Sequence, residues 1–195
     1  TSQTLFQLVK DPDPRFANQL LVGGTGNTAV SLGFGVALLV FFAGLAFWGE
    51  RFKRYRRTSI IFFGICGGFA LVAGAAIYNH SRDLGGAVQL GAGGVLIVGL
   101  FVLSGATPAA LGLLADVTEH FPADRGAIMG LYSVFLAVGQ ILGSLIGGVA
   151  AENAGIDGVL VATVVLLGVA VVPLGRLRAF EHVVPGGAEG QVELA

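Results

Sequence analysis

The stretch Trp48–Arg57, WGERFKRYRR, places five basic side chains within seven positions, between two long segments that carry no charge. The uncharged segments run from Phe16 to Gly49 and from Thr58 to Ser81. A helix needs about 20 apolar residues to cross the roughly 30 Å hydrocarbon core of a bilayer, so each segment is long enough for one crossing. The basic stretch is therefore predicted to be a short loop between two membrane-spanning helices.

The composition of the whole chain agrees with this prediction. Hydrophobic residues make up 54% of it and charged residues only 12%, about half the charged share of a soluble domain. The 32 glycines suit membrane helices whose backbones approach closely. A single cysteine, Cys66, excludes a disulfide framework and a thiolate metal site. Because the basic residues are clustered, no nucleic-acid partner is predicted, and neither a cofactor nor a metal is expected.

Cutting the sequence at its charges gives five predicted spans and an all-α integral membrane protein. Residues 1–27 are expected to be an extracytoplasmic loop or the end of a truncated preceding helix, and residues 179–195 a flexible cytoplasmic tail. The region between them, 28–178, is expected to form a five-helix transmembrane bundle in contact with the lipid bilayer. Its predicted spans are 28–49, 58–78, 85–115, 126–151 and 158–175.

The distribution of Lys and Arg predicts the orientation, because these residues stay on the cytoplasmic side of short loops. If the 50–57 loop is cytoplasmic, eight basic residues lie inside: Arg51, Lys53, Arg54, Arg56, Arg57, Arg125, Arg176 and Arg178. Only Lys10, Arg15 and Arg82 then lie outside. The sequence therefore predicts a multi-pass plasma-membrane protein whose segment begins outside and ends in the cytoplasm.

An external start needs something to carry it across the membrane. Residues 1–27 hold no basic region followed by an apolar core and a cleavage site, and the first residue is Thr1. We therefore expect an odd number of upstream spans. The missing N-terminal half of the same chain would then be a partner of these helices.

The stretch AFWGERFKRYRR, from Ala46 to Arg57, resembles the cytoplasmic signature of the major facilitator superfamily, Gly-x-x-x-Asp-Arg-x-Gly-Arg-Arg. Glu50 stands for the Asp, Arg51 for the Arg and Arg54 for the next basic position. Ala46 and Lys53 replace the two glycines, so the match is to the looser second copy of the motif, after the eighth helix of the family.

Two later stretches support the same resemblance. FPADRGAIMG, 121–130, is similar to the loop from the tenth into the eleventh helix of the family. GQILGSLIGG, 139–148, resembles the Gly-x-x-x-Gly-Pro-x-x-Gly-Gly pattern of the fifth helix, whose repeat counterpart is the eleventh, with Ser144 at the Pro position. The resemblance covers residues 28–178 and implies helices eight to twelve, a partial C-terminal bundle of this fold.

Charged residues gather at the predicted cytoplasmic face. The residues concerned are Glu50, Arg51, Arg54, Asp116 and Arg125. Opposite charges at one depth can form an ion-pair network between helices that holds in one conformational state and breaks in the other, as alternating access requires. The alternative is that they only fix the topology and contact anionic lipid.

The fourth predicted span combines a glycine row with a polar stripe. Gly139, Gly143 and Gly147 recur every four residues and, with Gly148, are expected to admit another backbone closely. One step round the helix, Ser133 and Gln140 belong to a polar stripe. Its small or polar residues are Gly130, Ser133, Ala137, Gln140, Ser144 and Gly148. A mid-membrane amide is costly unless it faces protein or water. The pair is therefore assigned to the substrate path, and the alternative is a hydrogen bond between helices.

The third predicted span contains Ser104, Thr107 and Pro108. The two hydroxyls share a helix face, and the proline frees a backbone carbonyl near Ser104. They are assigned to the substrate path, although the hydroxyls can equally satisfy the freed backbone. The second span, which lacks a strongly polar mid-span residue, is interpreted as peripheral. Tyr78, Asn79, His80 and Arg82 are interpreted as an interfacial rim rather than a ligand site.

The functional prediction is the C-terminal fragment of a secondary active transporter that moves a small solute by alternating access. The substrate and coupling ion stay open. If the intact transporter is proton-coupled, the titrating group is expected upstream or in the missing seventh helix. No span contains Asp, Glu, Lys, Arg or His, which argues against a membrane-embedded enzyme. A non-transporting receptor or assembly subunit is the remaining alternative.

Overall fold

The computed structural model describes residues 14–16, 18–21, 27–51, 57–82, 84–119 and 122–181. Within these ranges the chain is helical apart from short turns and contains no β-strand. Its α-helices are α2 (Asn27–Arg51), α3 (Arg57–Asn79), α4 (Gly86–Ser104), α5 (Ala106–Glu119) and α6 (Arg125–Glu181). Two 3-10 turns, η1 (Pro14–Phe16) and η2 (Pro122–Asp124), accompany them.

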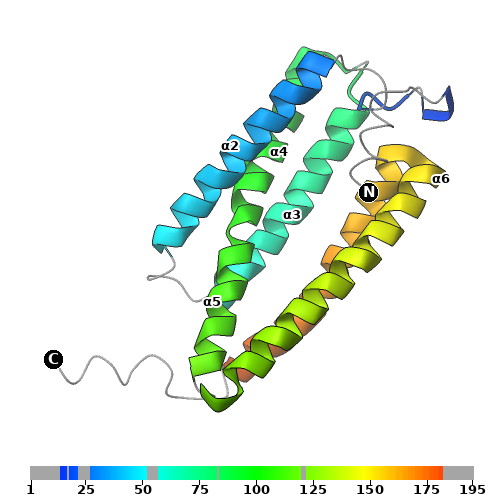
Figure 1. The fold of residues 1–195 in the computed structure, drawn as a ribbon. Helices are drawn as coiled ribbons and strands as arrows, with labels where there is room; N and C mark the ends of the chain where they lie inside the picture. The colour runs from blue at the N-terminus through cyan, green and yellow to red at the C-terminus, as the bar shows by residue number, and fades with distance from the viewer. Residues whose placement is uncertain are drawn as a thin grey trace.

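Four helical stretches are long and apolar enough to cross a membrane. They are Ser31–Arg51, Thr58–Asn79, Gly86–Ala115 and Arg125–Arg176. The last has 52 residues, or about 78 Å of helix, more than twice the thickness of the hydrocarbon core. Figure 1 shows that α6 does not continue straight: the chain runs along the bundle, turns sharply and returns beside itself.

The reversal inside α6 is made by two residues, Ala154 and Gly155, whose backbone is not helical. Gly155 has φ 62° and ψ −141°, a conformation that is essentially restricted to glycine. Each arm of α6 is long enough for one crossing, so the described helices offer five candidate crossings. The sequence suggested a loop over 152–157, but the glycine allows a much tighter turn. The other difference is in the expected span 85–115, which is interrupted at Gly105 between α4 and α5.

The α3 helix occupies the centre of the described bundle, and its interpretation as peripheral was wrong. In its most apolar stretch 39% is buried within the structure, whereas the buried share of the other three spans is between 6% and 11%. α3 packs against α4, α5 and α6, as Figure 1 shows. The interpretation failed because it relied on mid-span polar residues, whereas small residues mark packed faces in membrane helices.

Glycines bring the backbones of α3 and α4 into contact. A Cβ atom on Gly99 of α4 would lie 2.5 Å from the Leu71 nitrogen and 2.7 Å from the Gly67 carbonyl oxygen of α3. A Cβ atom on Gly74 would lie 2.7 Å from the Leu96 nitrogen. No side chain fits at these positions without a backbone shift, so this crossing is built on its glycines.

Candidate functional site

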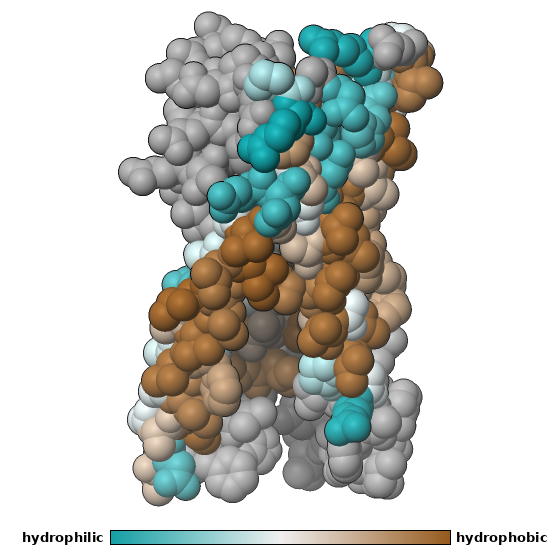
Figure 2. All heavy atoms as spheres, turned by 90° about the vertical axis from the view of Figure 1, so that its right-hand side faces the viewer, coloured by the Kyte–Doolittle hydropathy of each residue, from teal (hydrophilic) through white to brown (hydrophobic). Residues whose placement is uncertain are grey.

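The polar stripe of α6 lies on its first arm and faces away from the rest of the described chain. Ser133 and Gln140 are both exposed. The Ser133 hydroxyl donates to the Met129 carbonyl oxygen, 3.0 Å away, whereas no hydrogen bond joins the Gln140 amide to another described residue. Gln140 lines an open depression together with Ala137, Ile141, Ser144 and Leu145. Figure 2 views the molecule from the side on which α6 lies and shows hydrophobic residues over the middle of that side.

Three of the four glycines in the row on the same arm have open space beside them. A Cβ atom on Gly139, Gly143 or Gly148 would meet no atom within 4 Å, and Gly147 belongs to the same helical segment. The close helix approach expected at this row therefore stays a prediction. If it occurs, its partner is a surface outside the described residues.

The structure gives only part of the predicted ion-pair network. No ion pair joins the described side chains Glu50, Arg51 and Arg125 to one another. The Arg51 guanidinium instead lies over the Phe47 ring, 4.6 Å from its centroid. Arg54 and the side chain of Asp116 lie outside the described residues. The network remains a hypothesis about another conformational state.

The interruption between α4 and α5 separates the two hydroxyls that were expected to share a face. Ser104 is 1% exposed, and its hydroxyl donates to the Phe101 carbonyl oxygen at 2.7 Å. Thr107 is exposed and Pro108 half-buried. In this conformation Ser104 faces the α2 helix at Gly44 and not an open path, so its placement favours the alternative that the hydroxyl satisfies the backbone.

The Phe101 carbonyl oxygen also accepts a hydrogen bond from a side chain of α2. The Trp48 indole nitrogen donates to the Phe101 carbonyl oxygen at 3.1 Å. Gly105 leaves room for the indole, because a Cβ atom there would lie 2.7 Å from the Trp48 ring. The Gly105 backbone N–H bonds to the Val102 carbonyl rather than to that of Phe101. Side chains from two helices thus satisfy the carbonyl that the interruption frees, as the absence of water in a bilayer core requires.

Sequence reasoning missed a polar clasp at the opposite end of the bundle, formed by Gln19, Asn79, His80 and Asp157. The Asp157 carboxylate accepts from the Gln19 side-chain amide at 3.0 Å and from the Asn79 side-chain amide at 2.9 Å. His80 Nε2 lies 3.1 Å from the same carboxylate. Asn79 is 0% and Gln19 5% exposed, so this one carboxylate accepts from two buried amides.

The clasp also fixes the reversal of α6 and the segment that precedes α2. Gln19 donates to the Ala154 carbonyl oxygen and accepts from the Ile156 N–H, both at 3.0 Å. The Asn79 side-chain oxygen accepts from the Leu21 N–H at 3.0 Å. These hydrogen bonds join the segment that precedes α2, the end of α3 and the turn of α6. Asn79 was interpreted as part of an interfacial rim, but it is a buried structural residue.

Comparison with known proteins gives one result. A family model described as the Major Facilitator Superfamily matches residues 17–193, which is more than half of the chain. No curated protein and no solved structure matches the chain.

Proposed function

Because the chain belongs to the major facilitator superfamily, whose members are membrane transporters and not enzymes, we propose that it forms part of a secondary active transporter that moves a small solute by alternating access. The observation that supports this proposal is the polar stripe on the first arm of α6. It is a continuous row of small and polar residues on a helix whose other exposed side chains are mostly large and apolar.

The Gln140 amide is the central element of the argument. An amide in the middle of a membrane span is unfavourable unless it meets protein or a water-filled cavity. Gln140 is exposed and has no hydrogen-bond partner among the described residues. Its partner must therefore come from outside this bundle, as water and solute in a path or as a further helix.

The remaining parts of the proposal follow from the resemblance and from charge. We propose that a second helical bundle of the same transporter covers the α6 stripe and the row of Gly139, Gly143, Gly147 and Gly148. The path between the two bundles would include Ser133 and Gln140. The charges Glu50, Arg51, Arg54, Asp116 and Arg125 would pair in the state that closes the path on the cytoplasmic side of the plasma membrane.

Cysteine accessibility tests the path. In a Cys66→Ala background, which removes the only native thiol, Gln140→Cys is expected to react with a water-soluble thiol reagent in membranes. Leu142→Cys is the matched control. It lies two residues further along the same helix, about 200° round the axis, and Leu142 is also exposed, at 51%.

If Gln140 lines a water-filled path, the cysteine at 140 reacts and the cysteine at 142 does not. Equal protection of both positions would mean that the stripe is sealed against another helix, as the alternative of a hydrogen bond between helices requires. Equal reaction at both positions would mean that the α6 arm is not embedded in the membrane. Either result would contradict the proposed path.

A further inference from the structure

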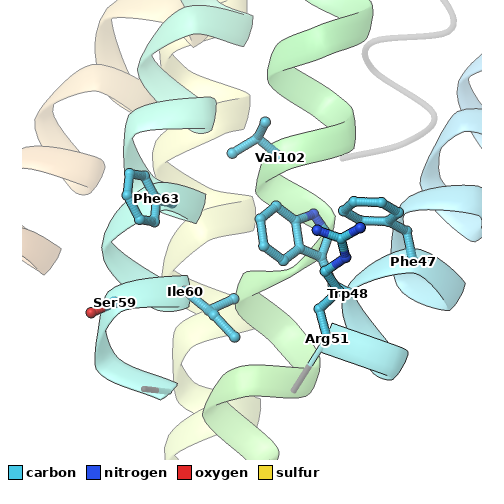
Figure 3. Close-up of a pocket in the computed structure, with 7 residues that line it drawn as sticks. All are labelled: Phe47, Trp48, Arg51, Ser59, Ile60, Phe63 and Val102. Atoms are coloured by element: carbon cyan, nitrogen blue, oxygen red, sulfur yellow. The ribbon is translucent and has the colours of Figure 1, made fainter. Parts of the chain in front are cut away.

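A second cavity lies at the basic end of the bundle, where α2 ends and α3 begins. It has a volume of about 390 Å³, within the range of small-molecule pockets. We call it the basic-end pocket. Its lining residues, drawn in Figure 3, are Phe47, Trp48, Arg51, Ser59, Ile60, Phe63 and Val102. They come from α2, α3 and α4, so the pocket is a crevice between three helices.

One cation stands at the end of an otherwise largely apolar pocket. Arg51 is the last residue of α2 and the only Lys, Arg, Asp or Glu among the lining residues. Its guanidinium is held over the Phe47 ring at 4.6 Å, a cation–π contact that fixes the group and leaves its edge free to donate. It forms no ion pair with another described residue. A fixed guanidinium with available N–H groups matches a phosphate group.

The walls of the pocket favour an acyl chain. The apolar surface comes from Ile60, Phe63 and Val102. In Figure 3 the Trp48 ring lies between these three side chains and the end of α2. The Trp48 N–H is already bound to the Phe101 carbonyl, so the indole offers the pocket mainly its ring. Aromatic residues of this kind are enriched where a helix leaves the membrane.

We propose that the basic-end pocket binds an anionic phospholipid, with the phosphate on Arg51 and part of an acyl chain against Ile60, Phe63 and Val102. Basic pockets between membrane helices bind anionic head groups in this way. The sequence that follows Arg51 adds Lys53, Arg54, Arg56 and Arg57. The head group of a zwitterionic lipid such as phosphatidylcholine carries a positive charge, which the basic residues of this region would repel. Charge therefore favours an anionic phospholipid.

The fluorescence of Trp48 tests the proposal, because Trp48 is the only tryptophan of the chain and lines the pocket. The 195-residue chain is placed in phosphatidylcholine nanodiscs that contain increasing fractions of phosphatidylglycerol with brominated acyl chains. Bromine quenches tryptophan at short range. Saturable quenching is expected with this lipid, and weaker, non-saturating quenching with brominated phosphatidylcholine.

Three variants locate the effect. Arg51→Gln should lower the apparent affinity for the anionic lipid about fivefold. Arg176→Gln removes an exposed positive charge from the other end of the sequence and should leave that affinity unchanged. Val102→Phe keeps every charge but fills the pocket, and should also weaken the selective quenching. Inorganic phosphate should not displace the lipid, because phosphate makes no contact with the apolar walls.

Equal quenching by the two lipids would overturn the proposal. So would equal losses in Arg51→Gln and Arg176→Gln, which would indicate a general surface-charge effect. An unchanged Val102→Phe would place the lipid elsewhere, and displacement by inorganic phosphate would identify a simple anion site. None of these outcomes depends on transport, so a failure here is distinguishable from a failure of the proposed function.

Discussion

Asp157 is the residue on which the polar clasp depends. Asp157→Ala leaves the buried Asn79 side-chain amide without its acceptor and leaves the Gln19 amide with the Ala154 carbonyl oxygen alone. A buried donor that loses its acceptor costs about 1–3 kcal/mol. We expect a clear fall in the free energy of unfolding, measured by Trp48 fluorescence or circular dichroism during unfolding in detergent. Asp157→Asn should fall between this variant and the unsubstituted chain, because an amide offers one acceptor oxygen in place of two.

Glu152→Ala provides the matched control for this prediction. Glu152 is an exposed carboxylate near the end of the first arm of α6, and no ion pair or hydrogen bond joins its side chain to another described residue. Its removal should change the free energy of unfolding by less than about 0.5 kcal/mol. Similar losses for Asp157→Ala and Glu152→Ala would mean that the clasp contributes nothing beyond the charge at this end.

The clasp shows why single residues were the least predictable part of the structure. The hydrogen bond from Gln19 to Asp157 spans 138 positions of the sequence, and no local pattern links two such residues. Gly155 is different, because a glycine next to Asn153 and Ala154, between two apolar runs, is a recognisable turn signal. Arg51 was singled out by its position in the sequence, and its functional role stays a prediction. Its contact with Phe47 depends on the conformation and could not be read from the sequence.

At the scale of elements, the close crossing of α3 and α4 gives a sharper prediction. In Gly99→Ala the added Cβ meets backbone atoms of α3, which cannot move as a side-chain end can. Overpacking of this kind costs about 1–3 kcal/mol. We expect a lower free energy of unfolding in the same assay and, where the helices separate, easier digestion by protease.

Gly94→Ala is the control in the same helix. A Cβ atom on Gly94 would meet no atom within 4 Å, and alanine favours a helix over glycine by up to about 1 kcal/mol. This variant should therefore be neutral or slightly more stable than the unsubstituted chain. If Gly99→Ala behaves like Gly94→Ala, the two backbones are not in contact and the central position of α3 is wrong.

The elements themselves could largely be predicted, since uncharged apolar runs between charges mark membrane helices. Which helices pack against one another could not be predicted. Gly139, Gly143 and Gly147 form the more regular row, yet a Cβ atom on Gly139 or Gly143 would meet no atom within 4 Å. The close contact is made instead by Gly67, Gly74 and Gly99. The spacing of small residues indicates where a helix can be approached closely, but it does not indicate which other helix packs there.

For the whole molecule, the two ends of the bundle differ in chemistry. The polar clasp joins the end of α3 to the reversal of α6, and these lie at one end of the bundle. The end of α2, which is Arg51, and the connection from α5 through η2 to α6 lie toward the other end (Figure 1). From Arg125 to Glu152 the first arm of α6 spans about 40 Å at 1.5 Å per residue, enough to connect the two faces of a bilayer. The excess of Lys and Arg at the second end predicts that it is cytoplasmic.

Labelling in intact cells tests this orientation. In a Cys66→Ala background, Glu152→Cys should react with a membrane-impermeant maleimide from outside, because Glu152 is exposed beside the reversal of α6. Glu119→Cys, at the exposed end of α5, should react only after the cells are permeabilised. The opposite pattern would place the basic end outside, and reaction of both in intact cells would show that the arm between them does not cross the membrane.

The same labelling result decides on which side of the membrane the basic-end pocket lies. Anionic lipid is attracted to juxtamembrane Lys and Arg at the cytoplasmic leaflet, so a cytoplasmic Glu119 puts Arg51 where such lipid is available.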